Sequence, residues 1–198
     1  MTSLVLASAS AVRARLLAAA GVAFDVIPAH LDEDAVKEAL LAQNTPMRGV
    51  ADALAELKAI RVSRSHPEAL VLGADQVLVF EKELVSKSPT VSEARALLTR
   101  LRGRKHELIG AAVLAKDGAA VWRHVDSATL TMRDFSDVFL DDYLAQEGEA
   151  VLGSVGCYHL EGRGAQLFAH IAGDYFSILG LPLIQVLGAL RDQGVLAS

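Results

Sequence analysis

Residues 69–85 read ALVLGADQVLVFEKELV, two apolar runs separated by the tetrad GADQ at positions 73–76. Short runs rich in valine and leucine are typical of buried strands. We expect a strand that ends at Asp75 or passes through it, and a turn at Glu81-Lys82 before a second strand. A carboxylate inside such a strand costs several kcal/mol to bury unpaired, so Asp75 needs a cation, unless it only accepts from loop amides. The stretch therefore predicts both a strand and a charged site.

Strand and helix signals alternate on both sides of this stretch. Helical apolar spacing, hydroxyl caps and closing glycines predict helices, whereas short apolar or alternating runs predict strands. The predicted helices are 10–21, 32–43, 51–65, 90–101, 136–147 and 182–193, and the further predicted strands are 3–8, 23–29, 106–118 and 119–134. Asp117-Gly118 is a hairpin signal between the last two strands. This order predicts an α/β or α+β architecture around a mixed sheet.

Composition and charge narrow the class of protein. The chain has 198 residues, of which 52% are hydrophobic and 22% charged, so we expect one globular domain over residues 1–198. The net charge of −5 argues against stable nucleic-acid binding through general electrostatics, although it leaves room for a basic pocket. No apolar run is typical of a membrane span, and no basic segment precedes the first apolar run as in a signal peptide.

The cysteine and histidine pattern excludes several kinds of chemistry. Cys157 is the single cysteine and cannot form an intrachain disulfide, which favours a cytoplasmic location. The base nearest to it in the sequence is His159, and no further triad signal accompanies the pair, so we assign no cysteine nucleophile. The histidines lack the spacing of zinc sites.

A strand-to-helix junction near the N-terminus carries two serines and an arginine. Residues 4–17 read LVLASASAVRARLL, with Ser8 and Ser10 after an apolar run and Arg13 in the following helix. The first N–H groups of a helix carry partial positive charge and attract anions. Hydroxyl groups and a guanidinium would complete a phosphate cradle. The alternative is an ordinary serine cap and a solvated arginine.

Further charged residues could complete a catalytic site around Asp75. Glu33 would add a second carboxylate, Lys58 lies at the edge of an apolar helix face, and Lys87 follows the Asp75 strand in the turn VSKSP. Each has a plainer interpretation, as a helix-dipole partner, a snorkelling side chain and a solvated lysine, respectively. Together with the cradle, these groups suit metal-assisted attack of water on a phosphoanhydride. Magnesium binds through one or two carboxylates plus substrate phosphates, so Glu33 and Asp75 would suffice as ligands.

Ordered motifs along nearly the whole chain resemble those of the Maf family of nucleoside triphosphate pyrophosphatases. They depart from the family pattern at Ala11 and Val12, which replace a proline and an arginine, at Ser86, which replaces a glycine, and at Pro89, which is displaced. The matching motifs are LASASAVRARLL (6–17), with Glu33 after it, AELKA (55–59), GADQ (73–76), VSKSP (85–89), LRGRKHE (101–107), EGRGAQLF (161–168) and IAGDYFSILGLPL (171–183).

The resemblance implies a Maf/ITPase-like fold, in which a mixed sheet with helices on both sides forms two lobes around a central cleft, often in a homodimer. It implies hydrolysis between the α and β phosphates to a monophosphate and pyrophosphate, with Mg²⁺ or Mn²⁺. Asp75 would be the general base or would activate a metal-bound water, Glu33 would assist the metal, and Lys58 and Lys87 would hold phosphates. Such an activity would suit house-cleaning of the nucleotide pool or control of cell division.

Three positions bear on the base of the nucleotide. Family members that act on dTTP and UTP carry Arg, Thr and Gln where this chain has Val12, Gln76 and Glu161. Gln76 and Glu161 instead resemble the subgroup that prefers 7-methyl-GTP. A carboxylate can accept from two N–H groups of guanine and suits the positive charge of a methylated one, whereas a pyrimidine offers one donor there. We favour 7-methyl-GTP, although EGRGAQLF resembles the pyrimidine subgroup and Val12 matches neither.

Two other function classes stay open from the sequence. A regulator of cell division could sense a triphosphate without hydrolysing it, and would bind the nucleotide without releasing pyrophosphate. A nucleic-acid-binding module is the second class, and the acidic net charge speaks against it.

Overall fold

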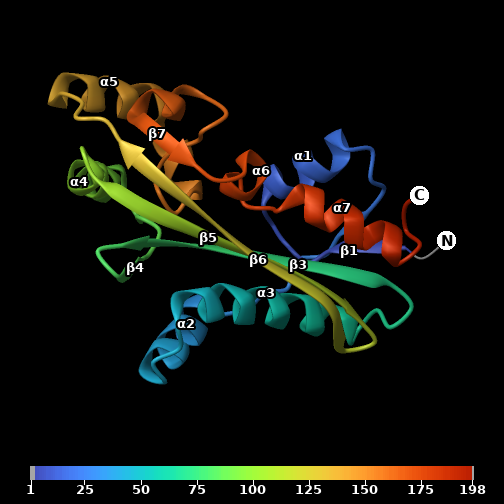
Figure 1. Ribbon diagram of the computed structural model, residues 1–198. Coiled ribbons are helices and arrows are strands. Elements are labelled where there is room, and N and C mark those ends of the chain that lie inside the picture. Colours follow the sequence, from blue (N-terminus) through green and yellow to red (C-terminus); the bar gives the residue numbers. More distant parts are fainter. Residues whose placement is uncertain (1–2, 198) are drawn as a thin grey trace. The chain divides into compact units, whose positions relative to one another are not determined.

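The computed structural model describes residues 3–197, which form a mixed α/β fold (Figure 1). Within these residues, strands follow the order β2-β1-β3-β5-β6-β7 in one sheet, and β4 pairs with β3. The strands are β1 (Leu4–Leu6), β2 (Asp25–Val26), β3 (Leu70–Phe80), β4 (Glu83–Val85), β5 (Lys105–Lys116), β6 (Ala119–Met132) and β7 (Phe168–Ala172). The helices are α1 (Ala11–Ala19), α2 (Glu33–Ala42), α3 (Met47–Ser63), α4 (Val91–Leu101), α5 (Asp137–Glu147), α6 (Tyr175–Ile178) and α7 (Leu183–Asp192), with 3-10 helices η1 (Gly148–Gly153) and η2 (Arg163–Leu167). The predicted α/β class with a mixed sheet is confirmed.

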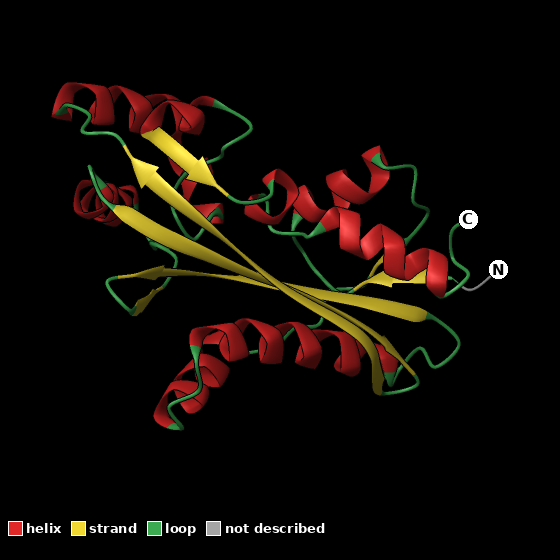
Figure 2. Cartoon of the chain, viewed as in Figure 1, coloured by secondary structure: helices red, strands yellow, loops and turns green. Residues whose placement is uncertain are grey.

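The sheet contains both strand directions. β1 is parallel to β2 and to β3, whereas β4 is antiparallel to β3 and β7 is antiparallel to β6. Figure 2 shows that β3, β5 and β6 are much longer than β1 and β2, which lie at one edge of the sheet. The sheet is therefore mixed, as the alternating strands and helices and the hairpin signal at Asp117-Gly118 predict.

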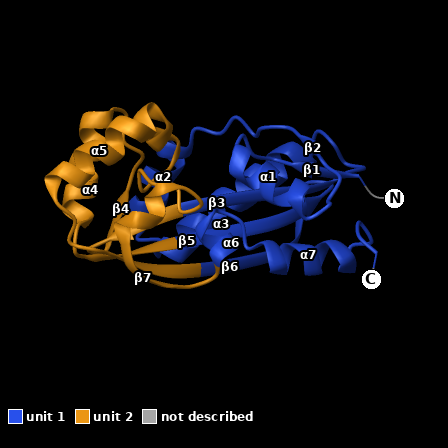
Figure 3. Cartoon of the chain, turned by 90° about the horizontal axis from the view of Figure 1, so that it is seen from above, with its two compact units in different colours: residues 1–76, 109–126, 175–198 blue, residues 77–108, 127–174 orange. Residues whose placement is uncertain are grey.

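The chain divides into two compact units (Figure 3). The first unit comprises Met1–Gln76, Ile109–Asp126 and Tyr175–Ser198, and the second comprises Val77–Leu108 and Ser127–Asp174. β3, β5 and β6 each contribute residues to both units, so no linker marks the boundaries in the sequence. In the described residues 3–197, no helix is both long enough and apolar enough to cross a bilayer.

Most predicted turns and caps are present. β3 runs through Asp75 without a break, and it turns at Glu81 and Lys82, whose φ values of 52° and 70° are left-handed. The predicted Asp-Gly hairpin joins β5 and β6. The N-caps of α1, α4 and α5 are Ser10, Thr90 and Ser136, as expected. Local chemistry therefore set these element boundaries.

The structure differs from the prediction at β2, α3, β7 and α6. The strand expected over 23–29 is reduced to the two residues of β2. The helix expected from residue 51 begins at Met47, because Pro46 occupies the N-cap, where its missing N–H costs nothing. β7 and α6 were not predicted, since both are short and follow glycine-rich sequence, and β7 depends on pairing with β6.

Helices cover the two faces of β1 and β3 in the first unit. Leu70, Leu72 and Ala74 belong to a buried cluster with residues of α1 and α7. Val71 packs instead in a cluster with Val62 of α3. Because side chains alternate across a strand, Leu70, Leu72 and Ala74 face α1 and α7, and the residues between them face α3 (Figure 1).

Gly73 allows α3 to lie close to β3. A Cβ atom at this position would lie 2.2 Å from the carbonyl oxygen of Ala55 and 2.7 Å from the amide nitrogen of Ala59, both on the α3 backbone. Backbone atoms cannot move aside as a flexible side chain can. The absence of a side chain at residue 73 therefore fixes the position of α3, and with it the position of Lys58.

We expect Gly73→Ala to lower the free energy of unfolding by about 3 kcal/mol or more, because the added methyl group must displace α3. Urea unfolding followed by circular dichroism measures this change. Gly110→Ala is the matched control on β5, since its Cβ would meet no atom nearer than 3.8 Å. The control is expected to change stability by less than about 1 kcal/mol. Equal effects of the two substitutions would contradict the close-packing explanation.

The second unit buries a histidine among aromatic rings. The Nε2 atom of His106 lies 2.7 Å from the hydroxyl oxygen of Tyr158, and within the described residues its buried Nδ1 atom has no hydrogen-bond partner. Burial lowers the pKa of His106 to about 4. The neutral imidazole is therefore the form that this core accommodates.

This lowered pKa predicts a loss of stability in acid. The unfolded chain binds a proton at His106 below the ordinary pKa of about 6.5, whereas the folded chain binds it only near the lowered value. Stability is therefore lost as the pH falls through this window, by about 2 kcal/mol between pH 7.5 and pH 5 from this group alone. Urea unfolding at both pH values should show a smaller acid loss in His106→Gln. An equal loss in the variant and the wild type would contradict the assignment.

Candidate active site

Three of the predicted site residues meet on the α3 side of β3 in the first unit. The Nζ atom of Lys58 lies 2.5 Å from Oδ1 of Asp75 and 2.7 Å from Oε1 of Glu33. The side chains of Lys58 and Asp75 are 9% and 6% exposed, whereas that of Glu33 is 41% exposed. One ammonium thus joins a buried carboxylate to a partly exposed one, and a snorkelling lysine does not describe this arrangement.

The local sequence explains why these groups converge. Gly73 holds α3 against β3, and Asp75 lies two residues later, on the same face of the strand. Lys58 is on the face of α3 that packs against β3, and it is buried. Glu33 is the first residue of α2, where Asp32 caps the helix and acidic groups are favourable.

The second carboxylate oxygen of Asp75 has no hydrogen-bond partner within residues 3–197. Oδ2 is buried and accepts no hydrogen bond from the residues that the structure describes. Such an atom costs about 1–3 kcal/mol when nothing replaces its water. With the partly exposed Glu33 nearby, the donor set is two carboxylates, which suits a hard cation that keeps several waters or binds phosphate oxygens. Within residues 3–197, no group of three or more His, Cys, Asp or Glu side chains could hold a metal alone.

Arg13 is bound largely to protein groups. Its Nε donates to the carbonyl of Gly180 at 2.8 Å, and its Nη1 donates to the Ala74 carbonyl at 2.8 Å and to the Ser8 hydroxyl at 3.1 Å. A guanidinium has five N–H donors, and the described contacts use neither of the two on Nη2, which could therefore bind a ligand. Arg13 is therefore not a solvated charge on the helix surface. Most of its described hydrogen bonds hold the protein together, and only part of the guanidinium could contact a phosphate.

The bond to Ala74 lies at a gap in the pairing of β3. β1 pairs with β3 as far as Leu72, and β4 pairs with it from Leu78 onward. Neither strand pairs with residues 73–77, and Arg13 supplies a side-chain donor to one carbonyl there. The residues around Asp75 therefore have backbone groups that neither of these two strands bonds.

Charge in this cluster is balanced. Burial lowers the pKa of Arg13, and the nearby carboxylates of Asp75 and Glu33 partly offset that effect by raising it. Two cations, Arg13 and Lys58, thus face two carboxylates. Because these four formal charges cancel, an anionic ligand would need further positive groups or a metal ion to bind tightly.

The N-terminus of α1 lies beside Arg13. Ser10 caps the helix by accepting from the amide of Arg13 at 3.4 Å, and the Ser8 hydroxyl accepts from the amide of Ser10 at 3.2 Å. The amides of Ala11 and Val12 are left without intrahelical partners, as at any helix start. The cap interpretation of Ser10 is thus confirmed, and two backbone donors remain beside the arginine.

Two of the predicted base-reading residues also belong to the first unit. Gln76 points to the face of β3 opposite Asp75, where its Nε2 donates to the carbonyls of Ser177 at 2.9 Å and Ile178 at 3.1 Å. Val12 is half-buried against the apolar cluster around α1 and α7. Their roles in base reading stay predictions.

Lys87 and Glu161 lie in the second unit. Lys87 is exposed two residues after the end of β4, and Glu161 is exposed in a turn before η2. Ser88, next to Lys87, is buried and accepts a hydrogen bond from the Cys157 thiol at 3.4 Å. Burial raises the pKa of that thiol, which agrees with assigning no cysteine nucleophile.

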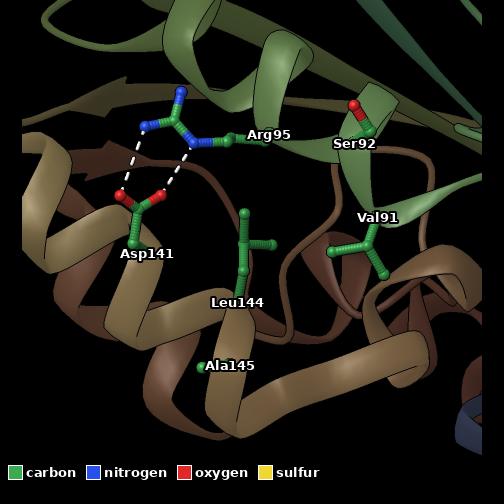
Figure 4. A pocket seen from close by; sticks show the side chains of 6 residues that line it. All are labelled: Val91, Ser92, Arg95, Asp141, Leu144 and Ala145. Carbon is green, nitrogen blue, oxygen red and sulfur yellow. Dashed lines mark hydrogen bonds and ion pairs between the residues drawn. The ribbon is translucent and has the colours of Figure 1, made fainter.

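An open groove between α4 and α5 in the second unit holds none of the predicted site residues (Figure 4). Arg95 and Asp141 form an ion pair of 2.7 Å in it, so the charges of this pair cancel. The remaining lining residues are Val91, Ser92, Leu144 and Ala145. The groove offers no catalytic groups comparable to those around Asp75.

Some residues that hold the site together by hydrogen bonds could not be identified from the sequence. Gly180 accepts from Arg13 across 167 positions, and Asp126 accepts from the Ser177 hydroxyl at 2.7 Å. Gly180 and Ser177 lie in the motif IAGDYFSILGLPL, which could have marked this segment, but Asp126 lies in an ordinary strand pattern.

Comparison with known proteins identifies similar chains along nearly the whole length. The model of the family described as Maf-like protein matches residues 3–193. A protein of Granulibacter bethesdensis named nucleoside triphosphate pyrophosphatase is 52% identical over 193 residues, which cover 98% of each chain. A protein of the same name from Caulobacter vibrioides is 51% identical over 196 residues, covering 99% of this chain and 98% of its own. A third, from Paramagnetospirillum magneticum, is 51% identical over 191 residues, covering 96% and 98%.

Proposed function

The chain belongs to the family of Maf-like proteins, and from this premise we propose that it is a nucleoside triphosphate pyrophosphatase that cleaves between the α and β phosphates. Relatives about 50% identical over nearly the full length carry that name. The observation that carries the proposal is the buried Asp75 carboxylate, whose Oδ1 is held by Lys58 and whose Oδ2 has no partner among the described residues. A carboxylate fixed at one oxygen and unsatisfied at the other is suited to accept a proton from water.

In this proposal the residues of the first unit divide the work. Asp75 orients the attacking water and takes its proton, while Lys58 fixes the position of the carboxylate. The Nη2 donors of Arg13 and the free amides at the start of α1 bind phosphate oxygens, with Ser8 and Ser10 holding this junction in shape. The positive groups stabilise charge on the leaving pyrophosphate. Lys87 is proposed as a further phosphate ligand only because its motif, VSKSP, matches the family pattern.

The carboxylates of Glu33 and Asp75 would hold a divalent cation, Mg²⁺ or Mn²⁺, because both supply hard oxygen donors and one oxygen lacks a partner in the described residues. When bound, the cation would neutralise phosphate charge, which the balanced protein charges do not do by themselves. Lys58 would then keep the two carboxylates in place.

For the base, we propose 7-methyl-GTP, with dTTP or UTP as the alternative within the same family. Gln76 and Glu161 match the subgroup that prefers the methylated guanine, and the acceptor oxygens of both suit a base edge with two N–H donors. Val12 fits an apolar cluster and gives no preference. We place the enzyme in the cytoplasm, since its one cysteine suits a reducing compartment.

A pyrophosphate-release assay with Mg²⁺ over 7-methyl-GTP, GTP, UTP and dTTP tests the proposal. We expect release from at least one nucleotide, fastest from 7-methyl-GTP. Faster release from UTP or dTTP would overturn the choice of base and leave the activity in place. Tight nucleotide binding with no release from any of them would favour the sensing regulator.

A further inference from the structure

A chain of hydrogen bonds runs from Gln76 to Asp126 on the face of β3 opposite Asp75. The Nε2 atom of Gln76 donates to the carbonyls of Ser177 and Ile178 at 2.9 and 3.1 Å. The hydroxyl of Ser177 donates to Oδ2 of Asp126 at 2.7 Å. Ser177 is 4% exposed. Every residue of this hydrogen-bond network lies in the first unit.

These contacts fix the orientation of the Gln76 amide. Both of its partners are carbonyl oxygens, which only accept, so the NH₂ group must face α6 and the amide cannot flip without losing both bonds. The group left to meet a ligand is Oε1, an acceptor. Held in this way, Gln76 presents one kind of hydrogen-bonding atom instead of two.

The orientation of Gln76 depends on α6, which cannot hold itself in place. α6 contains four residues, far fewer than a helix needs for stability of its own. Ser177 is the third residue of α6 and is buried. Its bond to Asp126 connects α6 to β6, at the last β6 residue that belongs to the first unit. At its other side, Arg13 binds the carbonyl of Gly180. Loss of the Ser177–Asp126 bond would therefore remove one of the contacts that position the two carbonyls that hold the amide.

We propose that Ser177 and Asp126 are positioning residues that hold Gln76 as an acceptor and thereby set the preference of the enzyme for its base. The inference rests on the proposed function, in which Gln76 contacts the base. A guanine edge offers two adjacent N–H donors, whereas uracil and thymine offer one N–H between two carbonyls. A locked acceptor favours the first pattern, and a released amide could turn its NH₂ group toward a pyrimidine carbonyl.

The test compares kcat and KM for 7-methyl-GTP and UTP in Ser177→Ala, Asp126→Ala and Asp126→Asn. We expect both alanine variants to shift the ratio of the two kcat/KM values toward UTP by about tenfold, mainly through KM, as for the loss of one hydrogen bond. Asp126→Asn keeps an acceptor for the Ser177 hydroxyl and should retain the wild-type ratio.

Ser63→Ala is the matched control, because Ser63 is also a fully buried serine of the first unit that makes a hydrogen bond, accepting from the amide of Gly118 at 2.7 Å. This control should lower the melting temperature and leave the ratio unchanged. A ratio that moves as far in Ser63→Ala as in Ser177→Ala would reduce the role of Ser177 to stability and overturn the proposal.

The outcomes separate this proposal from the proposed function. An active wild type whose base preference is unchanged in both alanine variants overturns the positioning role and leaves the activity standing. If the wild type releases no pyrophosphate from any nucleotide, the proposed function fails. In that case NMR of the side-chain amide protons of Gln76 still tests whether Ser177 holds the amide in place. Slow solvent exchange in the wild type and fast exchange in Ser177→Ala support the positioning role, and equal exchange rates overturn it.

Discussion

Asp75→Asn is expected to lower kcat for pyrophosphate release by about 10³-fold, because asparagine cannot take a proton from the attacking water. The substitution keeps the size of the side chain and an oxygen that can accept from Lys58, which lies 2.5 Å from Oδ1 in the wild type. We therefore expect the protein to fold and to bind the triphosphate. Release is measured by a coupled pyrophosphate assay, and binding by calorimetry with the unreacted nucleotide.

Asp34→Asn is the control for this experiment. Asp34 is an acidic residue of the first unit whose side chain is 83% exposed and pairs only with Lys37 on its own helix in the described contacts. Its replacement should leave kcat within about twofold of the wild type, since exposed pairs contribute little. If Asp75→Asn retained more than about a tenth of the wild-type rate, Asp75 would not be the general base.

Lys58→Met should impair both stability and activity. It removes the ammonium that lies between Asp75 and Glu33 and leaves a buried carboxylate with no cation at Oδ1. Breaking one partner of a buried ion pair costs about 3–5 kcal/mol, and we expect a loss near the lower end because Glu33 is partly exposed. We also expect kcat/KM to fall by about 10²-fold, since the catalytic carboxylate loses its orientation.

Lys37→Met provides the comparison for the lysine. Lys37 pairs with Asp34 at 3.3 Å across one turn of α2. Such a pair contributes about 0.5 kcal/mol or less, so urea unfolding should barely change. Should Lys58→Met prove as stable as Lys37→Met, the ion pair with Asp75 would not be part of what holds α3 against β3.

Much of the fold follows from local sequence. Thr90 and Ser136 begin their helices where the hydroxyl caps predict, and Asp117-Gly118 turns β5 into β6. These features depend on a few neighbouring residues, whose propensities and hydrogen bonds do not require the rest of the chain. Short elements such as β7 were missed because they exist only through pairing with a distant strand.

By itself, the sequence determined the order of the main strands and helices, and it singled out Asp75 in an apolar strand, Lys58 at the edge of an apolar helix face and Glu33 as a second carboxylate. Only the tertiary structure decided that one ammonium joins both carboxylates, that Arg13 binds carbonyls at Ala74 and Gly180, and that Gln76 is turned toward α6. The physical reason is that caps and periodicity act between neighbours in the chain. Pairing of buried polar groups depends instead on strand order and on how closely α3 can approach β3 at Gly73.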